Sequence, residues 1–334
     1  MTETTAVVPQ GTPTTPAVKP KFEFTEPFED EHLNGLIYGE YGVGKSTLAA
    51  SAAEVPAMQD VLYIAAEAGE KVLVPYAKAG HLTVVRVSNY STIARIYEWL
   101  VLHTKYRDAG DIAKMAHLES LITGQVPEVP KQFRTVVIDS LTEVQVYLMY
   151  QLLGVNIGQS KLDLPPDTAE FKEWGQSSDM IKLLIRSFRD LRLNVIIVCS
   201  MEEKEDEKKR QLKRLLLPGK LATNVQGFLD FVGYLEKAKT DTGYAWRLNL
   251  TSGQTFQAKN RFGPTAPAYI DAPTMAKLHE LNLATPQTQE TPSNGNSNTA
   301  ADPSTRSSTA AARPAGTVRG PVRVGGPVRP AGRS

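Results

Sequence analysis

The chain has 334 residues, a formal net charge of +1 and a single cysteine, Cys199. One cysteine excludes an intrachain disulfide and suits a reducing compartment, and the balanced charge excludes a molecule that attracts polyanions over its whole surface. The longest apolar run, from Leu193 to Met201 and broken by Asn194, is too short to cross a bilayer. We therefore expect a soluble cytoplasmic protein with no membrane partner.

The two ends of the chain are poor in the side chains that build a core. Residues 1–26 are rich in Thr and Pro, and residues 286–334 consist mainly of Gln, Ser, Asn, Thr, Ala, Pro, Gly and Arg. We expect two disordered tails that flank one α/β domain over residues 27–285. The C-terminal tail holds six arginines against two acidic residues. It is therefore either a tether for nucleic acid or a protein partner, or a segment that only keeps the chain in solution.

A phosphate-binding motif follows the first predicted strand, residues 36–38, and opens a predicted helix over residues 46–53. The pattern G-x-x-x-x-G-K-[ST] is matched by the run Gly39-Glu40-Tyr41-Gly42-Val43-Gly44-Lys45-Ser46. We expect this run and Thr47 to bind a nucleotide, because the glycines let backbone N–H groups converge on phosphates at a helix N-terminus. Lys45 would neutralise the outer phosphates, and the Ser46 hydroxyl would ligate a magnesium ion. The alternative is a glycine-rich turn that binds nothing.

An acidic residue follows the next predicted strand, residues 61–66. Glu67 then lies at the C-terminal end of that strand, where open parallel sheets bind their ligands. A carboxylate at this place can orient or deprotonate the water that attacks a γ-phosphate, so we predict that Glu67 is catalytic. The alternative is a solvated glutamate in a turn shared with Glu70.

A second acidic residue ends a buried strand further along the chain. Residues 83–88 and 92–104 have the periodicity of a strand and of a helix, and neither carries recognisable chemistry. The run Thr135-Val136-Val137-Ile138-Asp139-Ser140 is typical of a buried parallel strand. Asp139 would hold the magnesium ion opposite Ser46. This pattern is common when it stands alone, and it becomes specific when it is paired with the phosphate motif.

A further core strand, residues 194–200, leads into a charged segment, residues 202–214. This segment holds five acidic and six basic residues. We expect a solvated helix or hairpin there. The alternative is a mobile loop whose basic half, residues 208–214, touches the phosphates of a bound nucleic-acid strand.

Two more predicted strands, residues 244–251 and 255–261, flank a Ser-Gly turn and are expected to form a hairpin near the sheet edge. Strand periodicity puts Lys259 and Arg261 on one face. Two cations at a strand tip suit a phosphate bound by a neighbouring subunit, so we predict that both are catalytic. A cation supplied in trans raises hydrolysis by about 10³ to 10⁵ fold. The alternative is an ordinary basic edge strand that discourages aggregation.

Together these segments resemble the RecA and DnaB class of P-loop ATPases. The similarity covers residues 33–275 and rests on the phosphate loop, Glu67, the strand ending in Asp139 and the segment Ala258–Thr265. In layout the chain most resembles the phage-encoded RecA-like ATPases of the Sak single-strand annealing group. The resemblance implies a RecA-like P-loop NTPase core with a mostly parallel central sheet and helices on both faces.

The same resemblance implies how the protein would work. It implies ATP and Mg²⁺ as cofactors, single-stranded DNA as a partner, and a ring or filament of identical subunits with ATP between neighbours. The location would be the host cytoplasm, and the tails would meet a single-strand-binding protein or another replication partner. The preference for adenine over guanine follows from the resemblance alone.

One departure from the RecA pattern concerns the coupling of ATP to DNA. RecA proteins carry a glutamine at the end of the fourth core strand, and Cys199-Ser200-Met201 stands at that place here. Three functions stay open at this point. The first is a recombination ATPase stimulated by single-stranded DNA, the second is a helicase or translocase of the same fold, and the third is a nucleotide-gated assembly module with slow turnover.

Overall fold

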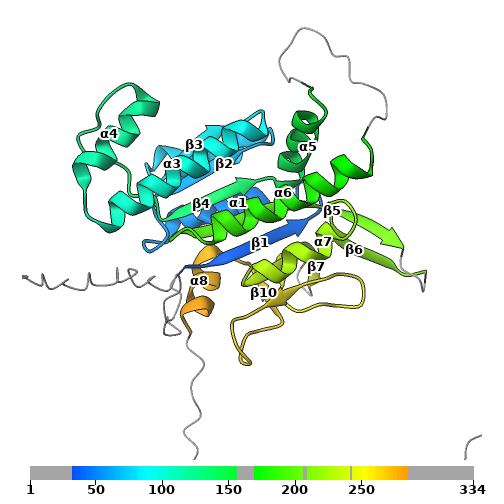
Figure 1. The fold of residues 1–334 in the computed structure, drawn as a ribbon. Helices are drawn as coiled ribbons and strands as arrows, with labels where there is room; N and C mark the ends of the chain where they lie inside the picture. Colours follow the sequence, from blue (N-terminus) through cyan, green and yellow to red (C-terminus); the bar gives the residue numbers. More distant parts are fainter. Residues whose placement is uncertain (1–31, 156–168, 206–208, 241–242, 285–334) are drawn as a thin grey trace, which may run out of the picture. The chain divides into compact units, whose positions relative to one another are not determined.

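The computed structural model describes residues 32–155, 169–205, 209–240 and 243–284. Within them the chain forms a ten-stranded sheet with helices on both faces (Figure 1). Both predicted tails, residues 1–26 and 286–334, lie outside the described residues. Within the part of the chain that the structure describes, no helix combines the length and the hydropathy of a transmembrane segment.

Six parallel strands form the centre of the sheet, in the order β7-β1-β5-β4-β2-β3. Their bounds are β1 Asn34–Gly39, β2 Val61–Ala65, β3 Leu82–Arg86, β4 Thr135–Asp139, β5 Asn194–Glu205 and β7 Phe231–Thr240. The apolar runs of β1, β2, β4 and the first part of β5 are buried, as expected for strands between two helical layers. The predicted α/β class and the first five predicted strands are confirmed, and β7 was not predicted.

Antiparallel strands extend the sheet beyond β7. β8 (Gly243–Asn249) pairs with β7 and carries β10 (Tyr269–Asp271), and β9 (Lys259–Asn260) pairs with the first residues of β7. The predicted hairpin between residues 244–251 and 255–261 is therefore wrong. β8 and β9 lie end to end along β7 and do not pair with each other, because both take their backbone partners from β7.

The charged segment after the fifth core strand forms a hairpin, as predicted. β5 runs on to Glu205, and β6 (Gln211–Leu215) returns antiparallel to it, from the Glu205–Gln211 pair to the Met201–Leu215 pair. Since Gly39, the last residue of β1, pairs with Ser200, the hairpin lies beyond the C-terminal end of β1 (Figure 1).

The helices divide the core into two layers. One layer is packed by α3 (Tyr90–Asp108), α5 (Leu141–Leu152), α6 (Phe171–Arg189) and α7 (Leu221–Asn224), and α4 (Ile112–Thr123) packs on α3. The other layer is packed by α1 (Lys45–Ala50), its continuation as a 3₁₀ turn over Ser51–Glu54, α2 (Val74–Lys78) and α8 (Met275–Leu283). The two predicted helices are thus confirmed. Side-chain caps from Asn89, Asp111, Ser140 and Thr274 begin α3, α4, α5 and α8.

Candidate active site

Three parallel strands bring the predicted phosphate loop, Glu67 and Asp139 to one edge of the sheet. In the strand register, Gly39 of β1 pairs with Ser200 of β5, and Asp139 of β4 pairs with Ala65 of β2. The C-terminal ends of these strands are therefore level, and the phosphate loop, Asp139 and Glu67 meet there. Open parallel sheets bind their ligands at this edge.

The phosphate loop between β1 and α1 needs glycine at two places for different reasons. Gly44 has φ 103°, a conformation that side-chain-bearing residues rarely adopt, immediately before α1. Gly39 lies so close to the neighbouring strand that a Cβ atom there would be 2.3 Å from the carbonyl oxygen of Leu235. One glycine makes the turn into the helix, and the other permits the close contact with β7.

The remaining loop residues differ in exposure. Val43 is buried in the core below the loop, whereas four members of the predicted site are exposed: Glu40, Tyr41, Gly42 and Thr47. The first N–H groups of a helix have no acceptor within the helix, so those at the start of α1 are available to an anion. Phosphate binding by the loop would therefore depend on backbone amides together with the side chains of Lys45 and Ser46.

Lys45 is buried, and its ammonium group lies against the loop. Nζ donates hydrogen bonds to the carbonyl oxygens of Gly39 at 3.0 Å and Glu40 at 2.8 Å. Burial lowers the pKa of Lys45, and the negative charges of Glu67 and Asp139 act in the opposite direction. In this poorly hydrated position, the charge of Lys45 interacts more strongly with an anion than it would in water.

Asp139 links the loop to the sheet. Its Oδ2 atom accepts a hydrogen bond from the Ser46 hydroxyl at 2.6 Å and another from the Tyr63 hydroxyl. Its Oδ1 atom is buried and has no hydrogen-bond partner among the described residues. Magnesium is bound by one or two protein oxygens together with phosphate oxygens and water. Ser46 and Asp139 therefore fit this ion, and their role as its ligands stays a prediction.

Tyr63 is a member of the site that sequence reasoning missed. It is buried in β2, and burial together with the charge of Asp139 raises the pKa of its hydroxyl. The hydroxyl therefore keeps its proton and remains a donor to Asp139. A tyrosine inside an apolar strand is usually a core residue, so the only signal in the sequence is a polar atom in a strand next to the one that ends in Asp139.

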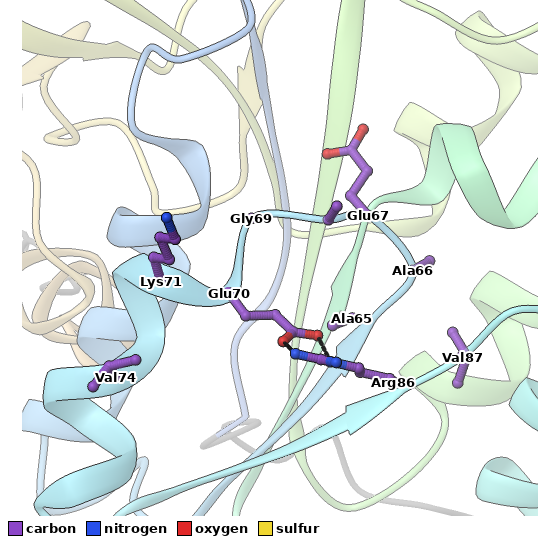
Figure 2. Close-up of a pocket in the computed structure, with 10 residues that line it drawn as sticks. Ala65, Ala66, Glu67, Gly69, Glu70, Lys71, Val74, Arg86 and Val87 are labelled. Atoms are coloured by element: carbon purple, nitrogen blue, oxygen red, sulfur yellow. Dashed lines mark hydrogen bonds and ion pairs between the residues drawn. The ribbon is translucent and has the colours of Figure 1, made fainter.

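Glu67 follows β2 and points away from Glu70 (Figure 2). Its backbone N–H donates to the carbonyl oxygen of Asp139 at 3.2 Å. Burial raises the pKa of Glu67 and the charge of Asp139 raises it further, while a hydrogen bond with Ser140 and the charge of Lys45 lower it. A carboxylate with a raised pKa is a stronger base, as the removal of a proton from water requires.

Glu70 does not share the environment of Glu67. Both of its carboxylate oxygens accept hydrogen bonds from the guanidinium group of Arg86 (Figure 2). This ion pair and Glu67 line a cavity of about 620 Å³, together with Lys71 and Val74. Glu70 is thus held by a neighbouring strand, whereas Glu67 lies close enough to Asp139 and Lys45 for their charges to shift its pKa.

The predicted trans-acting cations lie at the opposite edge of the sheet. Lys259 of β9 pairs with Val232, and the preceding residue Phe231 pairs with Gly35 near the start of β1. The phosphate loop begins at the other end of β1. The chain therefore does not bring Lys259 or Arg261 to its own phosphate loop.

Arg261 and Lys259 are held beside one carboxylate at that far edge. Arg261 is exposed, forms an ion pair with Asp230 at 3.5 Å and donates to the carbonyl oxygen of Gly227 at 2.9 Å. Burial lowers the pKa of Lys259, and the positive charge of Arg261 lowers it further. The catalytic role predicted for both residues stays a prediction that requires a second copy of the chain.

A basic residue of the β5–β6 hairpin lies next to the phosphate loop. Lys213 Nζ donates to the Tyr234 hydroxyl at 3.0 Å and lies 3.8 Å from Glu40 Oε1. These three side chains and Glu236 line a cavity of about 190 Å³ beside the loop. The sequence places Lys213 in a charged run, but only the fold of the hairpin brings it to the loop.

The segment that departs from the RecA pattern is part of the same hairpin strand. Cys199 is buried, and burial raises the pKa of its thiol to about 12. The hydroxyl of Ser200 is buried without a partner among the described residues, and Met201 pairs with Leu215 of β6. β5 thus continues without a break through the place where RecA proteins carry a glutamine.

Comparison with known proteins gives one family match and several similar folds. The AAA domain family model matches residues 31–262. A KaiC-like protein from Pyrococcus horikoshii OT3 is 12% identical, with 73% of this chain and 90% of that chain covered and a TM-score of 0.36. The flagellar accessory protein FlaH from Methanocaldococcus jannaschii is 13% identical, with 73% and 85% covered and a TM-score of 0.36. Among curated proteins the search found no match.

Proposed function

The chain belongs to the AAA domain family, and from this premise we propose that it is a magnesium-dependent ATPase that acts on single-stranded DNA in phage recombination or annealing. The mostly parallel sheet and the phosphate loop at the end of β1 support the RecA-like P-loop ATPase that the sequence resembles. The observation that carries the proposal is the convergence of Lys45, Ser46, Asp139 and Glu67 at one edge of the sheet.

In this proposal, each of the four residues has a separate task. Lys45 exchanges its bonds to the loop carbonyls for bonds to the outer phosphates, and the backbone amides of the loop hold the phosphate chain. Ser46 and Asp139 hold the magnesium ion, which neutralises phosphate charge when bound. Glu67 accepts the proton of the attacking water, and its raised pKa suits that task.

Single-stranded DNA is proposed from the resemblance to the Sak group and from the position of the β5–β6 hairpin. Lys213 Nζ lies 3.8 Å from Glu40 Oε1 in the phosphate loop, so a nucleotide bound at the loop would lie beside the hairpin. The exposed Lys204 and Lys209 and the arginines of the C-terminal tail offer charges to a phosphate backbone.

Assembly into a ring or filament is proposed from the separation of the two edges of the sheet. Lys259 and Arg261 lie at the edge opposite to their own phosphate loop. They can act on a bound nucleotide only from a neighbouring copy, which supports a head-to-tail arrangement with ATP between subunits.

The proposal is tested by the rate of ATP hydrolysis of the full chain with and without a thymidine oligonucleotide, at one fixed salt concentration. We expect hydrolysis that depends on magnesium and rises with the oligonucleotide. Lys45→Ala should abolish both the basal and the stimulated rate, because the outer phosphates lose their cation. The matched control is Lys78→Ala, an exposed lysine at the end of α2, which should leave both rates unchanged.

Two outcomes would contradict parts of the proposal. Full activity in Lys45→Ala would show that the phosphate loop is not the site of ATP hydrolysis. If the oligonucleotide changes neither the rate of hydrolysis nor the oligomeric state, the protein does not act on single-stranded DNA. That result would favour a nucleotide-gated assembly module. Directional unwinding of a duplex would identify a helicase or translocase instead.

A further inference from the structure

Trp246 lies beside the phosphate loop although it comes from a distant part of the chain. A Cβ atom built on Gly44 would be 3.4 Å from Nε1 of Trp246 and 3.8 Å from its Cδ1. The indole edge therefore lies next to the loop residue that immediately precedes α1. Trp246 is nevertheless 52% exposed, so part of the ring is open to solvent next to the loop.

The fold explains how β8 places this ring. Leu248, two residues further along β8, points to the same face of the sheet and is buried in the core layer that includes Leu48 of α1. Trp246 continues that row of side chains past the end of the core. It therefore emerges where α1 begins, on the same side of the sheet as the phosphate loop.

The surroundings of Trp246 are not those of a core tryptophan. Among the described residues the indole N–H has no hydrogen-bond acceptor, and buried tryptophans usually have one. Across the strand pair, Lys237 lies directly opposite Trp246, and its Nζ is 5.8 Å from the ring centroid. A flat, half-exposed aromatic ring and a cation thus stand together at the rim of the loop.

Given the proposed nucleotide binding at this loop, on which the inference rests, we propose that Trp246 is the platform on which the purine base of the bound nucleotide stacks. The loop amides and Lys45 bind the phosphate chain, and the sugar and base extend from it along the start of α1. Aromatic side chains bind bases by stacking on their flat faces, which contributes about tenfold to a hundredfold in affinity.

This assignment has a consequence for specificity. Stacking depends on the area of the base and not on its hydrogen-bonding edge, because every base has a flat π-face. The platform therefore favours purine over pyrimidine nucleotides and discriminates weakly between ATP and GTP.

The test compares two ligands that differ only in the base and sugar. The affinities of ATP and of inorganic tripolyphosphate, both with magnesium, are measured for the full chain. Trp246→Ala should weaken ATP binding by about tenfold to a hundredfold and leave tripolyphosphate binding unchanged. Trp246→Phe should restore most of the affinity for ATP, because a smaller aromatic face remains.

The matched control is Tyr269→Ala. Tyr269 is 46% exposed on the neighbouring strand β10, and its ring is stacked under Arg247. It pairs with Asn249, three residues from Trp246, so it lies on the opposite face of the sheet. This variant should bind both ligands like the wild type. ATP should also quench the tryptophan fluorescence of the wild type, and the quench should be lost in Trp246→Phe.

The outcomes separate the platform from the proposed function. Unchanged ATP affinity in Trp246→Ala would overturn the platform. An equal loss for both ligands would also overturn it, because the ring would then only support the loop. If the wild type binds neither ligand, the phosphate site itself is absent, and the proposed function fails together with the platform.

Discussion

The predicted catalytic residues lie at two opposite edges of the parallel sheet, and they are held differently at each edge. At the C-terminal edge, Ser46 and Asp139 are joined by a hydrogen bond of 2.6 Å, and Lys45 and Glu67 lie beside them. At the N-terminal edge, Arg261 is paired with Asp230 and lies at the far end of β1 from the loop. The first group is assembled within one chain, and in the proposed function the second group meets a phosphate of another copy.

Beyond the loss of Lys45, the largest effect is expected when the far edge is altered. Arg261→Ala should lower hydrolysis in the assembled protein by about 10³ to 10⁵ fold, because a trans-acting cation is lost from the transition state. ATP affinity of the isolated chain should stay unchanged. The control is Arg189→Ala, another arginine that is paired with an aspartate, Asp190, and it should retain the rate.

Mixing two inactive variants sharpens this contrast between the edges. A site formed by Glu67 of an Arg261→Ala subunit and Arg261 of a Glu67→Gln subunit has both groups intact. Activity should therefore return when the two variants are mixed. If the mixture is as inactive as its components, Arg261 does not act across an interface.

A smaller effect is expected at the C-terminal edge. Glu67→Gln should lower kcat by about 10² to 10⁴ fold and leave ATP binding intact, because the amide cannot accept the proton of water. In the wild type, the acidic limb of the rate profile should lie above the usual glutamate value of about 4.3, since burial raises the pKa of Glu67. A limb at or below that value would point to another base.

The smallest effect concerns stability. Because burial raises the pKa of Glu67 in the folded chain, the folded chain binds this proton more tightly than the unfolded one. Protonation of Glu67 therefore stabilises the folded chain. This contribution to the free energy of unfolding is fully present below the unfolded pKa of about 4.3 and is lost as pH rises through the folded pKa. Glu67→Gln should therefore be more stable than the wild type at pH 8, with a difference that shrinks toward acidic pH.

Urea unfolding curves at several pH values measure this difference. Glu70→Gln is the control, because Glu70 is engaged by Arg86 and its loss should bring no gain in stability at pH 8. A difference between Glu67→Gln and the wild type that does not change with pH would show that the raised pKa does not govern it.

The strands of the site could be predicted because an acidic residue or the phosphate motif follows or ends each apolar run. The apolar runs before Glu67 and Asp139 have the length and composition of buried parallel strands, and the C-terminal ends of such strands meet at one edge. The phosphate motif adds a spacing that few other structures share. For these residues the local pattern and the position in the fold carry the same information.

The rest of the fold and of the site depends on which strands pair with each other, and a local sequence pattern does not contain that information. Without β7, residues 244–251 had no partner other than residues 255–261, and the expected hairpin followed from that omission. Tyr63 resembles a core residue until Asp139 is placed next to it. Lys213 and Trp246 reach the loop only because β6 and β8 return to it from distant parts of the chain.

The bonds from Lys45 to the carbonyl oxygens of Gly39 and Glu40 set the starting state for any ligand that enters the loop. A polyphosphate must compete with these internal acceptors for the ammonium group, so its measured affinity is the net result of an exchange. The same two acceptors solvate the cation in place of water. They allow the chain to fold with this lysine inside it before any anion has arrived.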